Sequence, residues 1–314
     1  MDPWTQAMRR GDFEAAWRVC DRVLQLRRER DCSHWPRHLQ YVWDGAPLED
    51  RRVLVRCYHG LGDTLQFMRL LAPLRARAQR VILWIQPALA DIARTLAGVD
   101  QLVPLHDGTP QADYDVDIEL MELPHALRLS ARDLPGCIPY IFAPTNLEGA
   151  WLGEERRHGN RLRVGLAWRG GDWVFHRSIP VRLLEPLGRV TGVDWFSLQY
   201  PAEQPPFSAA DIAHRDIARV AARMQSLDLI ISVDTMTAHL AGALGLNVWT
   251  LLAADCDWRW MSRRADSPWY PTMRLFRQRR AGQWRDVITA VAQELQTFHR
   301  ERPPHRVNRA RDIR

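Results

Sequence analysis

Two stretches decide the fold of this chain: Val53-Leu-Val-Arg-Cys-Tyr-His-Gly-Leu-Gly-Asp63-Thr-Leu-Gln-Phe67 and Leu227-Asp-Leu-Ile-Ile-Ser-Val-Asp234-Thr-Met-Thr-Ala-His239. Each is a β-rich apolar run, followed by small or acidic residues and then by a helical pattern. A parallel strand feeds a helix in this way at the carboxyl edge of an α/β sheet, where such folds bind ligands. Free N–H groups at a helix N-terminus suit a phosphate. One such junction in each half predicts two lobes that face each other across a ligand cleft.

The surrounding residues alternate between strand-like and helix-like patterns, which is the rhythm of a parallel sheet with crossover helices. We expect strands at 53–57, 80–86, 101–105, 114–118, 162–168, 195–199, 229–233 and 248–252. We expect helices at 63–77, 88–96, 217–225, 235–244 and 284–300, and another after Ser178-Ile-Pro180. The predicted units are a helical extension at 1–49, a first lobe at 50–150, a linker at 151–161, a second lobe at 162–300 and a tail at 301–314. The predicted fold class is α/β, with two Rossmann-like lobes facing a cleft and a short helical N-terminal extension.

The composition is that of a soluble globular protein. The 314 residues suffice for two domains, and no apolar run approaches the ~20 residues needed to span a bilayer. The first residues, Met1-Asp-Pro-Trp-Thr-Gln, lack the basic-then-apolar layout of a signal peptide. The five cysteines are scattered and never spaced Cys-x-x-Cys, which argues against a disulfide framework and a structural zinc site. A reducing cytoplasm is therefore the expected compartment.

The basic residues are all arginine, because the sequence contains no lysine. A clamp on a phosphate or carboxylate must therefore use guanidinium groups or backbone amides. The net charge of +6 suits an anionic substrate, but it is too modest and too dispersed to indicate nucleic acid binding. Six arginines lie in the tail His299–Arg314, which we expect to be disordered; a second hypothesis is that the tail docks on an anionic membrane face, such as the inner membrane.

The N-terminal extension is expected to form two short helices around Gly11-Asp12. Asp12 is a candidate N-cap for the second helix. An apolar stripe follows it, formed by Phe13, Ala16, Trp17, Cys20, Val23 and Leu24. The sequence Gly11-Asp-Phe-Glu-Ala-Ala16 resembles part of one tetratricopeptide unit. A single unit of this kind cannot bury its own apolar face. We therefore expect it to pack on the rest of the chain.

The loop His59–Asp63 invites a dinucleotide-binding interpretation, because Gly60 and Gly62 begin a Gly-x-Gly-x-x-Gly pattern. Leu65 occupies the place of the third glycine, and the acidic residue expected about 20 positions later is missing. A nicotinamide or flavin cofactor is therefore disfavoured.

Asp63 itself has two interpretations. It fits the N-cap of a helix at 63–77, with Gln66 completing a capping box. It also fits a general base at the lip of a cleft, acting on an acceptor hydroxyl. Local sequence leaves both open.

Asp234 and Thr235 open the junction in the second lobe. Asp234 is explained well as an N-cap. Thr235 and His239 are spaced i to i+4 on one helix face, so both could reach the same ligand, with Thr235 donating to a phosphate. We favour a functional interpretation of this pair.

Two further segments carry candidate ligand-binding residues. Gly170 and Gly171, within Arg169-Gly-Gly-Asp172, form either a simple turn or a place where the backbone approaches a diphosphate. Arg177 is a candidate cation for that charge, and Ser178 a candidate N-cap for the next helix. The aromatic stretch Asp257–Pro271 could stack on a base or sugar ring, or could simply be a packed loop.

Together these segments resemble the heptosyltransferase-like glycosyltransferases (glycosyltransferase family nine), in the branch often fused to tetratricopeptide repeats. The resemblance covers roughly residues 50–295. The matching segments occur in the family's order: Gly-Leu-Gly-Asp63-Thr-Leu-Gln-Phe, Val-Gly-Leu-Ala-Trp168, Arg177-Ser-Ile-Pro, Ser-Val-Asp234-Thr-x-x-Ala-His239-Leu-Ala-Gly-Ala-Leu-Gly245, and Asp257-Trp-Arg-Trp with Ser-Pro-Trp-Tyr-Pro271.

The resemblance implies the type B glycosyltransferase fold, inversion at the anomeric centre and no bound metal. It implies no cofactor beyond a nucleotide-diphosphate sugar as co-substrate, with an ADP-sugar favoured, and a glycan, lipopolysaccharide or protein acceptor. Asp63 matches the catalytic base. Arg177 matches a basic position, commonly lysine, that helps neutralise the donor diphosphate. Asp234 and Thr235 match the donor-binding pair, and His239 lies in the same motif.

The sequence also departs from the family pattern. Met236 stands where Gly or Ala is usual, and the repeat array is reduced to about one unit. Two other functions remain open on this basis. One is a sugar-nucleotide epimerase or hydrolase, and the other is a degenerate transferase retained as a binding or scaffold module.

Overall fold

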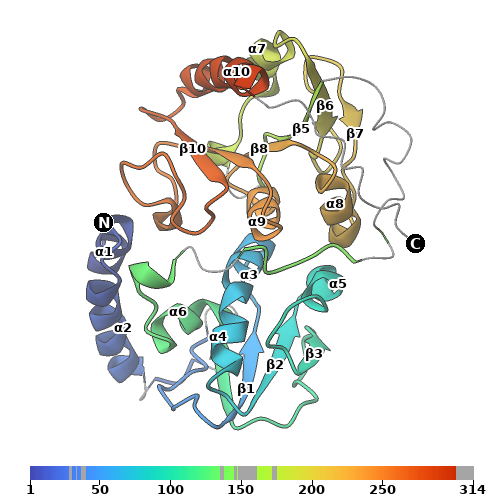
Figure 1. Ribbon diagram of the computed structural model, residues 1–314. Coiled ribbons are helices and arrows are strands. Elements are labelled where there is room, and N and C mark those ends of the chain that lie inside the picture. Colours follow the sequence, from blue (N-terminus) through green and yellow to red (C-terminus); the bar gives the residue numbers. More distant parts are fainter. Residues whose placement is uncertain are drawn as a thin grey trace.

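The computed structural model describes residues 1–27, 30–32, 34–36, 40–134, 138–144, 147, 161–171 and 175–301. The predicted linker apart from Arg161, the tail beyond Glu301 and Asp172 lie outside the described residues. Within the described ranges, two parallel sheets form two lobes, and Figure 1 shows helices α3 and α9 between them. The predicted α/β class with two Rossmann-like lobes is confirmed.

The first lobe contains a four-stranded parallel sheet in the order β3-β2-β1-β4 among the described residues. Its strands are β1 (Arg52–Arg56), β2 (Arg80–Ile85), β3 (Gln101–Pro104) and β4 (Val116–Glu119). The apolar residues of β1 alternate between its faces, with Val53 and Val55 in the main core and Leu54 in a smaller cluster on the opposite face. The carboxyl ends of β1 and β4 therefore deliver the loop at 57–60 and Glu119 to one edge.

The helix expected at 63–77 is divided into α3 (Leu61–Phe67), the 3₁₀ turn η2 (Met68–Leu70) and α4 (Leu71–Arg75). Pro73 has no N–H to donate to a preceding carbonyl, so the helical ladder is interrupted and restarts with Pro73 in the first turn of α4. The remaining helical elements of the lobe are short: η3 (Pro87–Leu89), α5 (Ala90–Ala93), η4 (Leu120–Glu122), α6 (Leu123–Ala126) and η5 (Ala131–Asp133).

The second lobe contains a six-stranded parallel sheet in the order β10-β9-β8-β5-β6-β7 among the described residues. Its strands are β5 (Leu162–Ala167), β6 (Val193–Ser197), β7 (Ala210–Asp211), β8 (Leu229–Val233), β9 (Val248–Leu252) and β10 (Met273–Arg277). The sequence analysis missed β7, which has two residues, and β10, whose two arginines interrupt its apolar character.

Helices cover both faces of this second sheet. Its helical elements are η8 (Phe175–Arg177), η9 (Val181–Leu184), α7 (Glu185–Gly188), α8 (Ile217–Met224), α9 (Met236–Ala243), η10 (Trp258–Trp260) and α10 (Trp284–Glu301). One face shares a core with η9, α7 and α10, at the top of Figure 1. The other face shares a core with α8, α9 and residues of the first lobe. No helix of the described chain is long and apolar enough to cross a membrane.

The lobes meet closely where α3 packs on α9. A Cβ placed on Gly62 of α3 would lie 3.0 Å from Cδ2 of His239 and 3.5 Å from the backbone of Met236, so glycine permits this approach. Away from the helices, the guanidinium of Arg69 donates to the carbonyl of Trp269 at 2.6 Å. These contacts join the two lobes into one continuous core.

The N-terminal helices α1 (Pro3–Arg10) and α2 (Phe13–Arg27) form a hairpin that contacts both lobes, at the left of Figure 1. Arg9 on α1 pairs with Asp255 of the second lobe at 2.9 Å. Nε1 of Trp17 on α2 donates to the carbonyl of Leu129 in the first lobe at 2.7 Å. Asp12 caps α2 as predicted, accepting from the amide of Ala15 at 3.0 Å. The hairpin therefore packs on the rest of the chain.

Only the first half of the predicted apolar stripe on α2 is covered. Phe13, Ala16 and Trp17 are buried, whereas Cys20 and Leu24 are half-buried and Val23 is 37% exposed. The second half faces a cavity that is described below.

Candidate active site

Asp63 lies in the first turn of α3, and the predicted N-cap role is wrong. The helix begins at Leu61 with Gly60 as its N-cap residue, and Asp63 is the third helical position. Its carboxylate accepts from the amide of Gly60 at 3.0 Å, which satisfies a free donor at the helix start. Gln66 does not complete a capping box, since its side chain is fully buried one turn further on. The Asp63 carboxylate remains partly exposed at the interface between the lobes.

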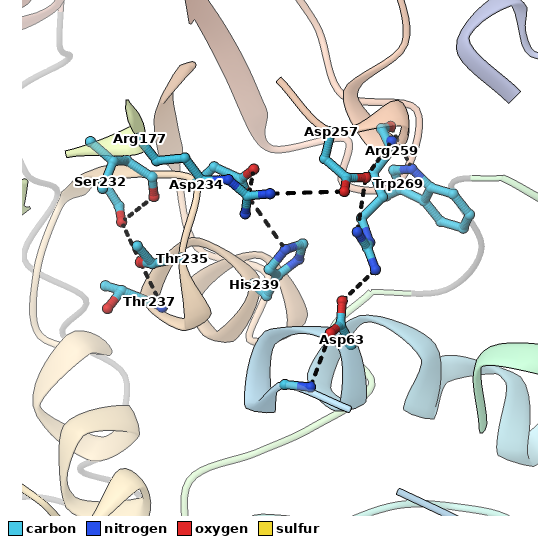
Figure 2. Close-up of polar contacts among 12 residues, drawn as sticks. Asp63, Arg177, Ser232, Asp234, Thr235, Thr237, His239, Asp257, Arg259 and Trp269 are labelled. Atoms are coloured by element: carbon cyan, nitrogen blue, oxygen red, sulfur yellow. Dashed lines mark hydrogen bonds and ion pairs between the residues drawn. The ribbon is translucent and has the colours of Figure 1, made fainter. Parts of the chain in front are cut away.

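Arg259 of the second lobe reaches the Asp63 carboxylate (Figure 2). The same guanidinium pairs with Asp257 at 2.8 Å and lies 5.0 Å from the ring centroid of Trp258. Burial alone would lower the pKa of Arg259, but the carboxylates of Asp257, Asp63 and Asp234 raise it. The Arg259 guanidinium therefore stays positively charged in this buried position. The sequence analysis missed Arg259, although the Asp-x-Arg pattern in Asp257-Trp-Arg was a signal for it.

Arg177 continues this arrangement toward α9. Its guanidinium lies 3.1 Å from Asp234 and 3.9 Å from Asp257. Asp63, Arg259, Asp257, Arg177 and Asp234 therefore form a chain of alternating charges that runs from the first lobe to the second (Figure 2). We call these five residues the interlobe charge chain.

The N-cap of α9 is Thr235 and not the predicted Asp234. The amide of Thr237 donates to Oγ1 of Thr235 at 3.3 Å, and Ser232 lies within 3.4 Å of the same oxygen. This leaves the Asp234 carboxylate available to Arg177. Burial raises the pKa of Asp234, and the nearby Arg177 opposes that shift.

His239 is buried beneath the start of α9. Its Nδ1 lies 3.0 Å from the hydroxyl of Tyr270, its ring stacks on Trp260 at 5.3 Å, and its Nε2 lies 3.8 Å from Asp234. Burial lowers the pKa of His239 well below its usual value, and Arg259 and other guanidinium groups add to the effect. His239 is therefore neutral and only 4% exposed, whereas Thr235 is half-buried. Thr235 is the N-cap residue with an extended backbone, so the i to i+4 spacing within one helix that was expected for the pair does not apply.

The amides of the glycine turn in the second lobe already have acceptors. Those of Trp168 and Arg169 donate to Oε1 of Gln199 at 3.1 and 2.9 Å. The amide of Gly170 donates to Oγ of Ser178 at 3.1 Å. Ser178 is therefore not the predicted N-cap, because η9 begins after Pro180. Gly171 is exposed at the rim of this turn.

A second carboxylate lies behind the loop that precedes Asp63. Glu119, at the end of β4, accepts from the amide of Tyr58 at 3.1 Å, and its Oε1 lies 3.9 Å from Nε2 of His59. Burial raises the pKa of Glu119 to about 8, so it is mostly protonated at neutral pH. Local sequence does not predict this raised pKa, because an acidic residue at the end of a strand is ordinarily solvated.

The aromatic stretch Asp257–Pro271 is largely a packed loop. Trp260, Trp269 and Tyr270 are fully buried, so they support the site from behind. Trp258 is half-buried and stacks on Phe67 of α3 at 6.3 Å. It is the member of this set that a ligand could touch.

The interlobe charge chain contains three carboxylates and two guanidinium groups. Nε of Arg177 and Nε of Arg259 are buried and have no acceptor. Because both Nε atoms are buried, an anionic ligand would reach the two guanidinium groups at their terminal nitrogens, where it would compete with carboxylates for the two cations. Within the described ranges no group of three or more His, Cys, Asp or Glu side chains is placed to hold a metal ion.

The arrangement of two sheets with a site between them matches solved structures. A glycosyl transferase family 9 structure from Veillonella parvula DSM 2008 superposes with a TM-score of 0.62 at 12% identity, covering 82% of this chain and 99% of that one. The E. coli ADP-heptose LPS heptosyltransferase II superposes with a TM-score of 0.56 at 11% identity, covering 79% and 98%. The chain has the family 9 glycosyltransferase fold.

A third structure with this family 9 fold carries a metal. The iron-containing dodecameric glycosyltransferase TibC from enterotoxigenic E. coli H10407 superposes with a TM-score of 0.51 at 12% identity, covering 80% of this chain and 78% of that one.

Sequence comparison adds one curated relative. Protein FlbA of Caulobacter vibrioides is 24% identical, and the match covers 82% of this chain. The chain spans about half (48%) of the length of that relative. No protein-family model matches the sequence.

Proposed function

We propose that the protein is a glycosyltransferase that moves a sugar from a nucleotide-diphosphate sugar to an acceptor hydroxyl, with inversion at the anomeric carbon. The observation that carries this proposal is the interlobe charge chain. It ties Asp63 of the first lobe to Asp234 of the second, within the family 9 fold. A base on one lobe and donor-binding groups on the other are what a single displacement between two bound substrates requires.

Asp63 is the proposed catalytic base. The acceptor oxygen forms a bond to the anomeric carbon from the face opposite the leaving diphosphate, and Asp63 takes its proton. The carboxylate is partly exposed and is anchored by the amide of Gly60, so it can be approached from the cleft. Arg259 holds the same carboxylate and must turn toward the donor phosphates when the acceptor binds.

The donor lobe is proposed to stabilise the leaving group. The bond from the anomeric carbon to the diphosphate oxygen breaks, and both electrons leave with the nucleoside diphosphate. Arg177 and Arg259 are proposed to donate N–H groups to that oxygen or its neighbours in place of the carboxylates that they hold in this structure. Thr235 at the start of α9 and the turn at Gly170 and Gly171 are proposed to border the phosphates. Asp234 and His239 then position Arg177 and the helix start.

The finer assignments also belong to this proposal. An ADP-sugar, with heptose as the first sugar to test, is suggested by the fold shared with an ADP-heptose transferase. We propose that transfer needs no bound divalent metal, because the guanidinium groups of Arg177 and Arg259 would supply the positive charge that a metal otherwise brings to a diphosphate. A glycan, lipopolysaccharide or protein remains the acceptor class, and the cytoplasmic side of the inner membrane the proposed location.

The donor is tested first by thermal stabilisation with ADP, UDP, GDP and dTDP, with and without EDTA. We expect one nucleotide to raise the melting temperature of the wild type with an apparent dissociation constant at least tenfold lower than those of the others. EDTA should leave this stabilisation unchanged. Asp234→Ala should lose the stabilisation. Equal stabilisation by all four nucleotides, or abolition by EDTA, would contradict the donor assignment.

The base is tested by Asp63→Asn, which keeps an acceptor oxygen for the Gly60 amide but cannot take a proton. We expect transfer from ADP-heptose to fall at least 10³-fold while nucleotide stabilisation persists. Asp91→Asn, on an exposed side chain of α5, is the matched control and should retain activity. Loss of nucleotide stabilisation in Asp63→Asn would mean that Asp63 serves structure instead.

A binding module without transfer is the second candidate. Arg259 occupies the Asp63 carboxylate, and Met236 stands at the start of α9 where a smaller residue is usual. Selective nucleotide binding with neither transfer nor hydrolysis of any nucleotide sugar would favour it.

A further inference from the structure

A cavity of about 660 Å³ lies between the N-terminal hairpin and both lobes. Its size is typical of small-molecule sites. Its walls come from α1, α2, the end of β4 with η4 and α6, and the aromatic loop of the second lobe, together with Trp35, Gln40 and Tyr41. The hairpin therefore lines a cavity as well as bridging the two lobes.

The uncovered half of the α2 stripe forms one wall. Cys20, Val23 and Leu24 line the cavity; Cys20 and Leu24 are only partly buried against the core, and Val23 is exposed. An apolar stripe normally packs on its neighbour, because leaving a Leu or Val side chain in water forgoes roughly 1.5–3 kcal/mol. The half-covered stripe indicates that a ligand with an apolar body completes the packing.

The cavity lies next to the Asp63 site, although Asp63 itself is not among its lining residues. His59, which precedes Asp63 in the loop, and Phe67, one turn after Asp63 on α3, both line it. Trp258 lines it from the second lobe, stacks on Phe67, and is the neighbour of Arg259. A molecule in the cavity would therefore have one end beside the proposed base.

The charges of the cavity disfavour an anion. Arg27, the permanent cation among its described lining residues, is paired with Glu122 at 2.9 Å and lies 3.8 Å from the ring centroid of Tyr41. Burial raises the pKa of both Glu119 and Glu122. A protonated Glu119 can donate a hydrogen bond to a neutral oxygen, whereas the one arginine among the described lining residues is already paired with a carboxylate.

We propose that this cavity is the acceptor subsite: it holds the aromatic or aliphatic body of a neutral, hydroxyl-bearing acceptor and directs its hydroxyl to Asp63. The assignment rests on the proposed function. It makes the N-terminal hairpin a determinant of acceptor specificity, through Cys20, Val23 and Leu24.

The cavity is tested with the neutral fluorophore N-phenyl-1-naphthylamine on the whole chain. Fluorescence should rise on binding to the wild type. Leu24→Trp fills the cavity and should weaken binding at least tenfold, as should Val23→Trp, which starts from a partly exposed position and is tolerated by the fold. Leu26→Trp is the matched control on the same helix, because Leu26 is 79% exposed and does not line the cavity. Equal binding by all four proteins would overturn the proposal.

Ligand charge is tested by displacing the fluorophore. We expect 3-phenylpropan-1-ol to displace it at concentrations at least tenfold lower than 3-phenylpropionate, which has the same body and a negative charge. Equal displacement by the two compounds would contradict the assignment to a neutral acceptor.

The link to Asp63 is tested by transfer from ADP-heptose to 3-phenylpropan-1-ol. Leu24→Trp should raise the KM for the alcohol at least tenfold and leave nucleotide stabilisation unchanged, while Leu26→Trp should match the wild type. Transfer that is insensitive to Leu24→Trp would overturn the acceptor role. Absence of nucleotide stabilisation in the wild type would instead refute the proposed function, which separates the two failures.

Discussion

Glu119→Gln tests the raised pKa of Glu119, a lining residue of the cavity, without the use of any substrate. Burial raises the pKa of Glu119 from 4.5 to about 8, Glu122 and Asp117 add to the shift, and Arg56 opposes it. The folded protein therefore holds a proton on Glu119 between pH 4.5 and 8 that the unfolded chain releases. By linkage, the free energy of unfolding falls as pH rises through this window and levels off above it.

The magnitude follows from the same values. One pKa unit corresponds to about 1.36 kcal/mol, and pH 7 lies about 2.5 units above the unfolded pKa. Keeping Glu119 neutral in the folded state therefore costs roughly 3 kcal/mol of stability at pH 7, and little at pH 4.5. Glutamine is neutral at every pH and its Oε1 can still accept from the Tyr58 amide, so the variant avoids this cost.

The assay is urea unfolding followed by tryptophan fluorescence at pH 5, 6, 7 and 8. We expect Glu119→Gln to unfold close to the wild type at pH 5 and to gain roughly 3 kcal/mol over it at pH 7. Glu185→Gln, on an exposed side chain of α7, is the control and should show no such trend. A stability difference that does not change between pH 5 and 8 would refute the reasoning, because it would mean that Glu119 ionises normally in the folded state.

Two further substitutions test the contact between the lobes. Arg259→Met should lower the free energy of unfolding by roughly 3 kcal/mol, since it leaves the partly buried carboxylates of Asp63 and Asp257 without their cation. Arg264→Met is the control, because Arg264 forms a solvent-exposed pair with Asp266, and it should lower the free energy of unfolding by less than about 1 kcal/mol. Equal urea midpoints for these two variants would show that the interlobe charge chain adds nothing to stability. Gly62→Ala places a methyl group 3.0 Å from Cδ2 of His239, so we expect a net loss of roughly 1 kcal/mol despite the better helix propensity of alanine. A higher melting temperature for Gly62→Ala would contradict this prediction, because it would mean that α3 and α9 can move apart enough to accommodate the methyl group without cost.

Local sequence predicted the central strands β5, β8 and β9 of the second lobe well, but not β7 and β10 at its edges. The bounds of β8 and β9 are those expected, because a parallel strand buried on both faces is a continuous apolar run between turn residues. Helix starts were predicted less well. Asp63 and Asp234 both have the side chain of an N-cap, yet Gly60 and Thr235 occupy those positions. Several neighbouring residues can cap a helix, and the packing of the preceding strand selects among them.

The sequence by itself determined where the two strand-to-helix junctions lie, because each junction is formed by consecutive residues. It therefore also determined that Asp63 and Asp234 lie at sheet edges. Only the tertiary structure decided which arginines link these two carboxylates, namely Arg259 beside Asp63 and Arg177 beside Asp234. Arg259 lies 196 residues from Asp63, and their contact depends on how α3 packs against α9. The sequence did not predict the cavity either, since the stripe on α2 has the pattern of a core-forming face, and only its neighbours in the fold determine that Cys20 and Leu24 are partly covered. Pairing over such distances is set by the packing of the whole chain, which local periodicity does not contain.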